Sequence, residues 1–283
     1  MRIKNTSVLY SVVSGHKMKR LIQILIILCL FPFCGFATGQ AGDILIFKGD
    51  TLSLFSNPLE QYLETKSERV FNGIKLEWTS TACYRGYRAT WEVSNDSLFL
   101  IKVQKGCYSE TPEYFDIKSE FGSERVFAHW FTGKTLAPKG KQIHYVHSGY
   151  ESFYEKELVL IFTGGLLSEQ IEYDNSKSYK SIFTENQDSL KTFIYTNINW
   201  NKISDLKDES IKVFVTIQSS ETLKPDSIQI IRGSENELIN EEAIRVIEML
   251  PEWDIYYRQG KVYRMKWTIP IIFNEEKRKK YAR

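Results

Sequence analysis

The sequence has little proline, little histidine and almost no net charge. Seven prolines among 283 residues exclude a long proline-rich extended segment. Four histidines provide few nitrogen ligands for a metal ion. A net charge of +2 gives the chain no strong preference for an acidic or a basic partner. The chain is 42% hydrophobic and 14% aromatic, which is typical of a globular protein with a substantial core.

The N-terminal segment has the features of a targeting signal. A basic start is followed by an apolar run over residues 21–36 and by small residues before Gln40. We therefore predict a signal peptide over residues 1–39, with Met18 as an alternative start. The run is shorter than the roughly 20 residues that a membrane-spanning helix needs. An uncleaved inner-membrane anchor through residues 21–36, or a lipid anchor on Cys34, are the alternatives.

Removal of this segment changes the charge of the chain. Residues 1–39 contain five basic and no acidic side chains, so the mature chain has 32 basic and 35 acidic residues and a net charge of −3. The mature protein therefore has no basic excess for nucleic-acid binding, and we expect it in the periplasm or outside the cell. The mixed run at residues 276–283 is expected to be a solvated tail.

Two cysteines, Cys83 and Cys107, remain after cleavage. The sequence between them has the pattern of two strands with a turn around Asn95. A hairpin centred there places the two cysteines opposite each other at its open end. In an oxidising compartment this arrangement predicts a disulfide.

Residues 41–175 are expected to form a β-rich domain. Apolar runs flank turn signals at Gly49-Asp50, at Asn95 and at Gly164-Gly165, which indicates repeated hairpins. This pattern predicts an antiparallel sandwich or a partly open barrel. Residues 176–189 are polar and are expected to be a linker.

The C-terminal region, residues 190–275, has the pattern of a small α+β layer. Residues 211–217 alternate between apolar and polar side chains, and residues 226–231 form a second apolar run. A helix is expected to begin at Asn240, with Ile247 on its apolar face, and Pro251 ends it. The last strand is expected over residues 263–273, with its odd-numbered side chains, Trp267 among them, facing the core.

This region resembles the C-terminal domain of TonB and its relatives. The matching segments are "IKVFVTI", "SIQIIRG", "NEEAIRVIEMLPEW" and "GKVYRMKWTIPIIF", which lie in about a third of the chain. The resemblance implies a three-stranded antiparallel sheet covered by helix, with the last strand at an edge. It also implies that this edge pairs with an extended segment of a partner such as an outer-membrane receptor. Pro270 fits such an edge. The residues expected to bind the partner are Tyr263, Arg264, Met265, Lys266, Trp267 and Thr268.

The chain departs from a TonB energy transducer in three respects. It lacks the proline-rich spanning segment, its hydrophobic start has the features of a cleavable signal, and a β-rich domain stands where a linker is expected. We therefore predict a non-enzymatic envelope protein whose C-terminal module binds a protein or peptide. The alternatives are a membrane-anchored variant transducer or accessory, and a ligand-binding or hydrolytic N-terminal domain with a structural C-terminal module.

No motif in the sequence predicts catalysis, a cofactor or a metal site. The pair His144 and His147 would share one face of a helix, but the surrounding pattern favours a strand, which places them on opposite sides. The glycines of "FTGGL" are explained by a hairpin turn. The aromatic and basic side chains of "CYRGYRATW" could bind a sugar or an anion, although a cross-strand ladder is the simpler interpretation.

Overall fold

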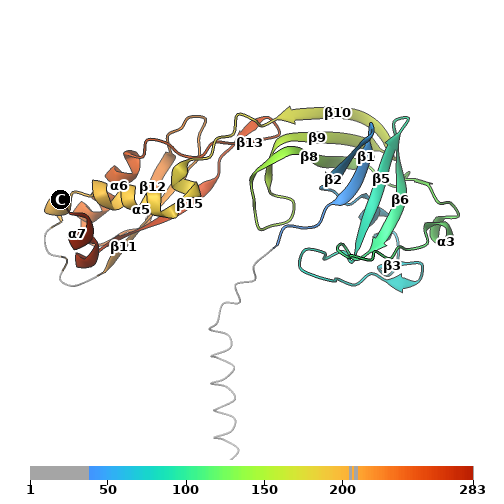
Figure 1. Ribbon diagram of the computed structural model, residues 1–283, viewed down its shortest axis with the longest axis horizontal. Helices are drawn as coiled ribbons and strands as arrows, with labels where there is room; N and C mark the ends of the chain where they lie inside the picture. The colour runs from blue at the N-terminus through green and yellow to red at the C-terminus, as the bar shows by residue number, and fades with distance from the viewer. Residues whose placement is uncertain (1–37, 204–205, 207–209, 283) are drawn as a thin grey trace, which may run out of the picture. The chain divides into compact units, whose positions relative to one another are not determined.

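The computed structural model describes residues 38–203, 206 and 210–282 (Figure 1). The predicted signal peptide therefore lies almost wholly outside the described residues. Within those residues, no helix combines the length and the hydrophobicity that crossing a membrane requires. Two separate apolar cores form, one in the N-terminal β-rich region and one in the C-terminal region.

The N-terminal region contains a large curved sheet (Figure 1). Its strand order is β2-β1-β5-β6-β10-β9-β8, with β7 paired to β6. The strands are β1 (Asp43–Phe47), β2 (Asp50–Leu54), β5 (Tyr87–Ser94), β6 (Ser97–Lys105), β7 (Val126–Phe127), β8 (Gly133–His144), β9 (Phe153–Thr163) and β10 (Leu166–Asp174). Smaller elements between them are α2 (Pro58–Leu63), β3 (Val70–Phe71), β4 (Ile74–Lys75) and α3 (Ile117–Phe121).

The β-rich α+β class is as predicted, but the purely antiparallel arrangement is wrong. Strands β1 and β5 pair in parallel, because the chain leaves the β1–β2 hairpin and crosses over before it returns beside β1. The sheet curls without closing into a barrel. Its two ends approach where the amide of Phe55 donates to the carbonyl of Leu136 at 2.7 Å. The core beneath the sheet contains the fully buried side chains of Trp91, Tyr87 and Phe162.

The expected hairpins form, with small differences in their turns. Gly164 and Gly165 connect β9 to β10 with positive φ values, as their sequence predicts. The β5–β6 turn is the two-residue pair Asn95 and Asp96, with φ values of 48° and 54°. Positive φ at both positions is the signature of the tight turn that suits the twist of a hairpin.

The C-terminal region is a three-stranded antiparallel sheet in the order β12-β11-β15. The edge position of the last strand is confirmed, and the first strand, β11, lies in the centre. The elements are α4 (Ile182–Glu185), α5 (Gln187–Asn197), a 3₁₀ turn (Trp200–Lys202), β11 (Ile211–Gln218), β12 (Asp226–Arg232), α6 (Glu237–Glu248), β13 (Tyr256–Arg258), β14 (Lys261–Tyr263), β15 (Lys266–Phe273) and α7 (Glu275–Tyr281).

Helix α6 begins one turn earlier than the sequence pattern indicated. Asn236 is its N-cap, because its side chain accepts a hydrogen bond from the amide of Leu238 at 3.1 Å. Asn240, the expected cap, lies inside the helix, where its amide side chain bonds the backbone of Ser234. Ile247 is fully buried on the face of α6 that covers the sheet, as predicted.

The predicted linker and tail are both more ordered than expected. Within residues 176–189, Tyr179 exchanges backbone hydrogen bonds with Ile255, and the amide of Ser181 donates to Asp254 at 2.7 Å. The last residues form α7, whose Tyr281 packs against the C-terminal core. Hydrogen bonds to buried residues order the first segment, and the packing of Tyr281 orders the second; a local sequence pattern shows neither.

Candidate functional site

Strand β15 leaves one edge open. Within the part of the chain that the structure describes, β15 pairs with β11 alone, in continuous register from Ile211 opposite Phe273 to Gln218 opposite Lys266. Backbone groups of an antiparallel strand point alternately to its two edges. The amide of Ile272 donates to the Tyr195 hydroxyl on α5, away from β11, at 3.2 Å. The even-numbered residues of β15 therefore present their backbone groups outward.

The outward-facing backbone of β15 is open over a short stretch. Lys266 and Thr268 offer both an N–H and a carbonyl, whereas Pro270 offers only a carbonyl. Pro270 lies opposite Phe214, at a position where the ladder with β11 requires no N–H. Beyond it, the Tyr195 hydroxyl already accepts the hydrogen bond of the Ile272 amide, and burial raises the pKa of this tyrosine. The stretch available to another strand thus ends at Pro270.

The opposite edge of the sheet, β12, is less suited to pairing. Its register with β11 shifts twice, between Phe214 and Val215 and between Thr216 and Gln218. Such irregularities increase the local twist and disturb the row of backbone groups, and natural proteins use them to protect sheet edges. The regular edge of β15 is the better template for an added strand.

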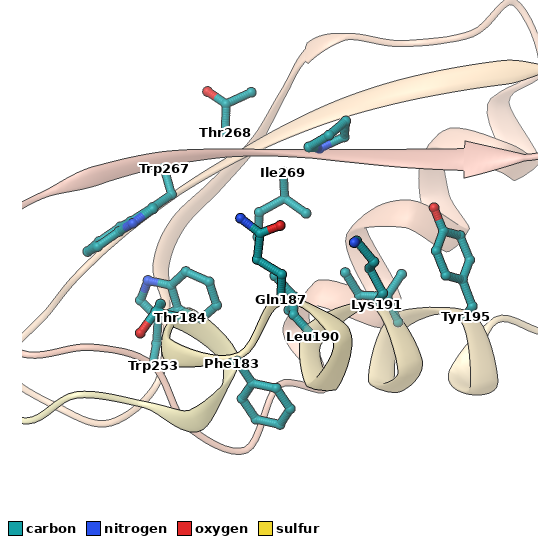
Figure 2. Close-up of a pocket in the computed structure, with 12 residues that line it drawn as sticks. Phe183, Thr184, Gln187, Leu190, Lys191, Tyr195, Trp253, Trp267, Thr268 and Ile269 are labelled. Carbon is teal, nitrogen blue, oxygen red and sulfur yellow. The ribbon is translucent and has the colours of Figure 1, made fainter. Parts of the chain in front are cut away.

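A groove of about 420 Å³ runs between β15 and the helices α4 and α5 (Figure 2). In Figure 2, Gln187, Lys191 and Tyr195 rise from α5 towards the strand, and Ile269 points down from it. Most of the lining is apolar or aromatic, and none of it is acidic. The lining residues are Phe183, Thr184, Gln187, Leu190, Lys191, Ile194, Tyr195, Trp253, Trp267, Thr268, Ile269 and Pro270.

The groove meets the C-terminal core at a group of aromatic rings. Trp253 is buried and packs edge-to-face on Trp267, with ring centroids 5.5 Å apart. Trp267 stacks in turn on Tyr256, with centroids 6.0 Å apart. The prediction that Trp267 packs towards the core is therefore confirmed, but the ring is only partly buried because it also lines the groove.

Three of the predicted edge residues lie outside β15. Tyr263 belongs to the β13–β14 hairpin and pairs with Tyr256. Arg264 forms an ion pair with Asp226 at 2.9 Å, and Met265 links the hairpin to β15. The expected strand over residues 263–273 therefore starts too early, because the turn at residues 259–260 folds its first residues back into a separate hairpin.

The β13–β14 hairpin fixes the point where β15 begins. At its turn, the amide of Gln259 donates to the buried carboxylate of Glu157 at 2.6 Å, and the amide of Gly260 donates to Asn175 at 3.0 Å. Asn175 also donates to Glu157 at 2.9 Å. These bonds hold a turn whose residues have positive φ values, and they anchor the strand that bears the open edge.

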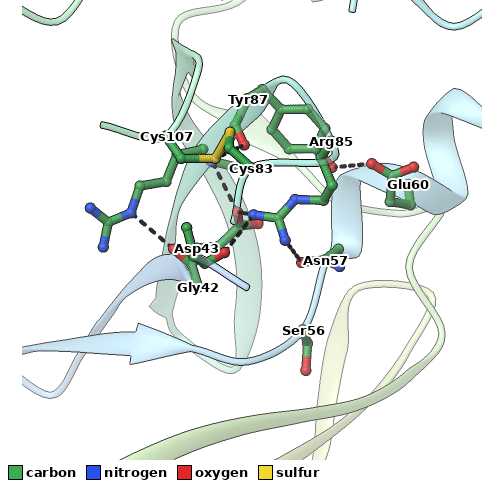
Figure 3. A network of polar contacts seen from close by, with 12 residues as sticks. Gly42, Asp43, Ser56, Asn57, Glu60, Cys83, Arg85, Tyr87 and Cys107 are labelled. Carbon is green, nitrogen blue, oxygen red and sulfur yellow. Dashed lines mark hydrogen bonds and ion pairs between the residues drawn. A yellow bond between two sulfur atoms is a disulfide. The ribbon is translucent and has the colours of Figure 1, made fainter. Parts of the chain in front are cut away.

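The predicted disulfide is present between Cys83 and Cys107, whose Cα atoms are 5.6 Å apart (Figure 3). The hairpin register that led to this prediction is different in detail. A shift between Thr90 and Trp91 moves the ladder, which ends at Tyr87 opposite Lys105. The two cysteines therefore lie in the loops beyond the ladder, where they join the segment before β5 to the segment after β6.

A buried polar network lies beside the disulfide (Figure 3). Asp43 is fully buried and accepts hydrogen bonds from Arg85 at 3.0 Å, from the indole of Trp91 at 3.0 Å and from the amide of Ala89 at 3.1 Å. Arg85 also bonds the carbonyl of Ala41 at 3.0 Å. Burial raises the pKa of Asp43 to about 6, although the Arg85 guanidinium acts in the opposite direction.

We interpret this network as structural. Arg85 also donates to the side chains of Asn57 and Tyr150, so its guanidinium ties together β1, the segment before α2 and the β8–β9 loop. Of the basic and aromatic side chains in "CYRGYRATW", Arg85, Tyr87 and Trp91 are buried. They cannot form the exposed sugar-binding or anion-binding surface that the sequence left as a possibility.

The two clustered histidines line the same pocket but pack against different neighbours. His144 ends β8 and packs against Phe153 and Tyr256, and burial lowers its pKa. His147 lies in the following loop against Tyr145. Among the described residues, no group of three or more potential metal ligands forms.

Sequence reasoning missed half of the groove. It identified the edge strand and expected "SLKTFIYTNINWNKISDL" to pack on the C-terminal module as a helix or an extended segment. It did not place Leu190, Ile194 and Tyr195 of α5 opposite that strand. The available signal was the spacing of these residues: Ile194 and Tyr195 follow Leu190 by four and five positions, on a helix that has a polar opposite face.

Comparison with known proteins finds no family model, no curated protein and no solved structure that matches this chain. The resemblance to the TonB C-terminal domain therefore stays a prediction. The strand order and the edge position of β15 agree with what that resemblance implies for the fold.

Proposed function

We propose that this protein is a non-enzymatic component of the cell envelope that binds an extended segment of another protein at the edge of β15. The observation that carries the proposal is an open, regular strand edge beside an apolar groove. An added strand would exchange backbone hydrogen bonds with Lys266 and Thr268. Every second side chain of that strand would enter the groove, since strand side chains alternate between two faces.

The sequence supports the location. The predicted signal peptide directs the chain out of the cytoplasm, and the Cys83–Cys107 disulfide suits an oxidising compartment. The resemblance to the TonB C-terminal domain favours a partner in the envelope, such as a segment of an outer-membrane receptor.

A peptide selection tests the proposal. Random heptapeptides displayed on phage would be selected on the mature chain, residues 40–283, and the affinities of the selected peptides measured with the purified protein. We expect peptides that protect the amides of Lys266 and Thr268 from hydrogen exchange. We also expect Thr268→Pro to weaken their binding at least tenfold, because it removes one edge donor and blocks the close approach of a strand.

Thr268→Ala is the matched control. It removes an exposed side chain but keeps the backbone N–H, so binding should change less than threefold. The Thr268→Pro variant should retain its circular dichroism spectrum, since the lost N–H is outside the ladder with β11. Equal binding by the proline variant and the wild-type protein would refute the proposed function.

A further inference from the structure

Trp253 has a buried hydrogen-bond donor without an acceptor. Its side chain is 1% exposed, and its indole nitrogen has no partner among the described residues. Three other indoles of the described residues have an acceptor. Trp91 donates to Asp43 at 3.0 Å, Trp200 to the carbonyl of Tyr195 at 3.0 Å, and Trp130 to a backbone carbonyl at 3.1 Å. A buried donor without a partner is costly, so this exception needs an explanation.

Trp253, which carries the unpaired donor, is one of the residues that line the β15 groove. Figure 2 shows the Trp253 ring between Thr184 and Trp267, facing the space below the strand. Trp267 covers it edge-to-face, at an interplanar angle of 87°. An aromatic face is at best a weak acceptor, so an oxygen atom in the groove would bind this N–H more strongly.

The charges around Trp253 indicate which acceptor fits. Its neighbours in the chain, Glu252 and Asp254, form no ion pair within the described residues. Asp254 accepts hydrogen bonds from Thr184 and Tyr256, each at 2.6 Å, so its charge stays close to the groove. Lys191 of α5 also lines the groove. A carboxylate at Trp253 itself would nevertheless lie beside Asp254 and be repelled, whereas a neutral amide or hydroxyl oxygen would not.

We propose that Trp253 is a specificity-determining residue that donates its indole N–H to a neutral oxygen on a side chain of the bound segment. This inference rests on the proposed function. The preferred segment therefore carries Asn, Gln, Ser or Thr at a position whose side chain enters the groove. The residues on either side of that position form the backbone hydrogen bonds with β15. The Trp267 side chain, which is partly exposed, moves aside to admit that oxygen.

A double-mutant cycle tests the pairing directly. The first change is Trp253→Phe, which keeps an aromatic ring and removes the donor. The second replaces the Asn, Gln, Ser or Thr of a selected heptapeptide by an apolar residue of similar size. We expect either change alone to weaken binding about tenfold, and the second change to have less than a twofold effect once the first is made.

Trp200→Phe is the control for the loss of ring volume. Trp200 is also buried, but its N–H is bonded, so this variant should lower the melting temperature more than Trp253→Phe does. Additive effects in the cycle, or selected peptides with an aspartate, a glutamate or only apolar residues at the coupled position, would overturn the inference. A selection that yields no Trp253-dependent binder would also overturn the inference. None of these results affects the Thr268→Pro test, which depends on the strand edge alone.

Discussion

Replacing Arg85 by methionine tests whether the buried network near the disulfide stabilises the fold through charge. Methionine keeps much of the side-chain volume but leaves Asp43 fully buried without its counter-ion. Removing one partner of a buried ion pair typically costs about 3–5 kcal/mol, because the remaining charge stays desolvated. The partly buried side chains of Asn57 and Tyr150 also lose one donor, but the Tyr150 hydroxyl still donates to Asn57 at 2.9 Å, so we expect a loss within this range at neutral pH.

The loss should depend on pH in a defined direction. In the wild-type protein, burial raises the pKa of Asp43 from 3.8 to about 6. The native state therefore binds more protons than the unfolded state between these values, and this carboxyl makes stability fall as pH rises from about 4 to 6. Without Arg85, which lowers the pKa of Asp43, the folded-state pKa rises further and the fall in stability extends to higher pH.

Urea denaturation of the mature chain at pH 5 and pH 8 measures both effects. The free energy of unfolding of Arg85→Met should lie closer to the wild-type value at pH 5 than at pH 8. Arg125→Met is the matched control, because Arg125 is exposed and its ion pair with Glu92 contributes at most about 1 kcal/mol. Equal losses in the two variants, or an Arg85→Met loss that is the same at both pH values, would refute the reasoning.

Two further predictions concern the cores. Ile247→Ala should lower the free energy of unfolding by about 2–5 kcal/mol, because Ile247 is fully buried. Lys266→Ala, on the exposed face of β15, should change the free energy of unfolding by less than about 0.5 kcal/mol. Comparable losses in the two variants would mean that the two faces are assigned wrongly. The denatured, unreduced mature chain should contain no free thiol, and titration of two thiols before reduction would contradict the disulfide. Reduction of Cys83 and Cys107 should lower the free energy of unfolding by about 3 kcal/mol for a loop of this length.

The C-terminal sheet was predictable because its information is local. The alternation along residues 211–217, the apolar stripe around Ile247 and the position of Pro270 each specify a face or an edge without reference to distant residues. The edge position of the last strand was implied by the resemblance to the TonB C-terminal domain, which stays a prediction. The start of β15 was not predictable, since the pattern of residues 263–265 continues the alternation and only the turn at residues 259–260 removes them from the strand.

The large sheet was predictable only in its hairpins. Local turn signals specify antiparallel neighbours, but the parallel pairing of β1 with β5 joins segments more than forty residues apart, which no turn encodes. Asp43 illustrates the difficulty. As a charged residue at the start of a strand it has the pattern of a solvated position, and only the approach of Arg85 and Trp91 makes its burial possible. The groove lining from α5 is a different case, because the spacing of its apolar residues was a local signal.

The end of the open stretch at Pro270 and Tyr195 has a kinetic consequence. A strand added to β15 meets only two outward N–H groups and three carbonyls before this point. Each backbone hydrogen bond contributes a net 0.5–1.5 kcal/mol or so, which is too little to hold a partner for long. The residence time of a bound segment would therefore depend on its side chains in the groove, and variants of the groove should change the dissociation rate far more than the association rate.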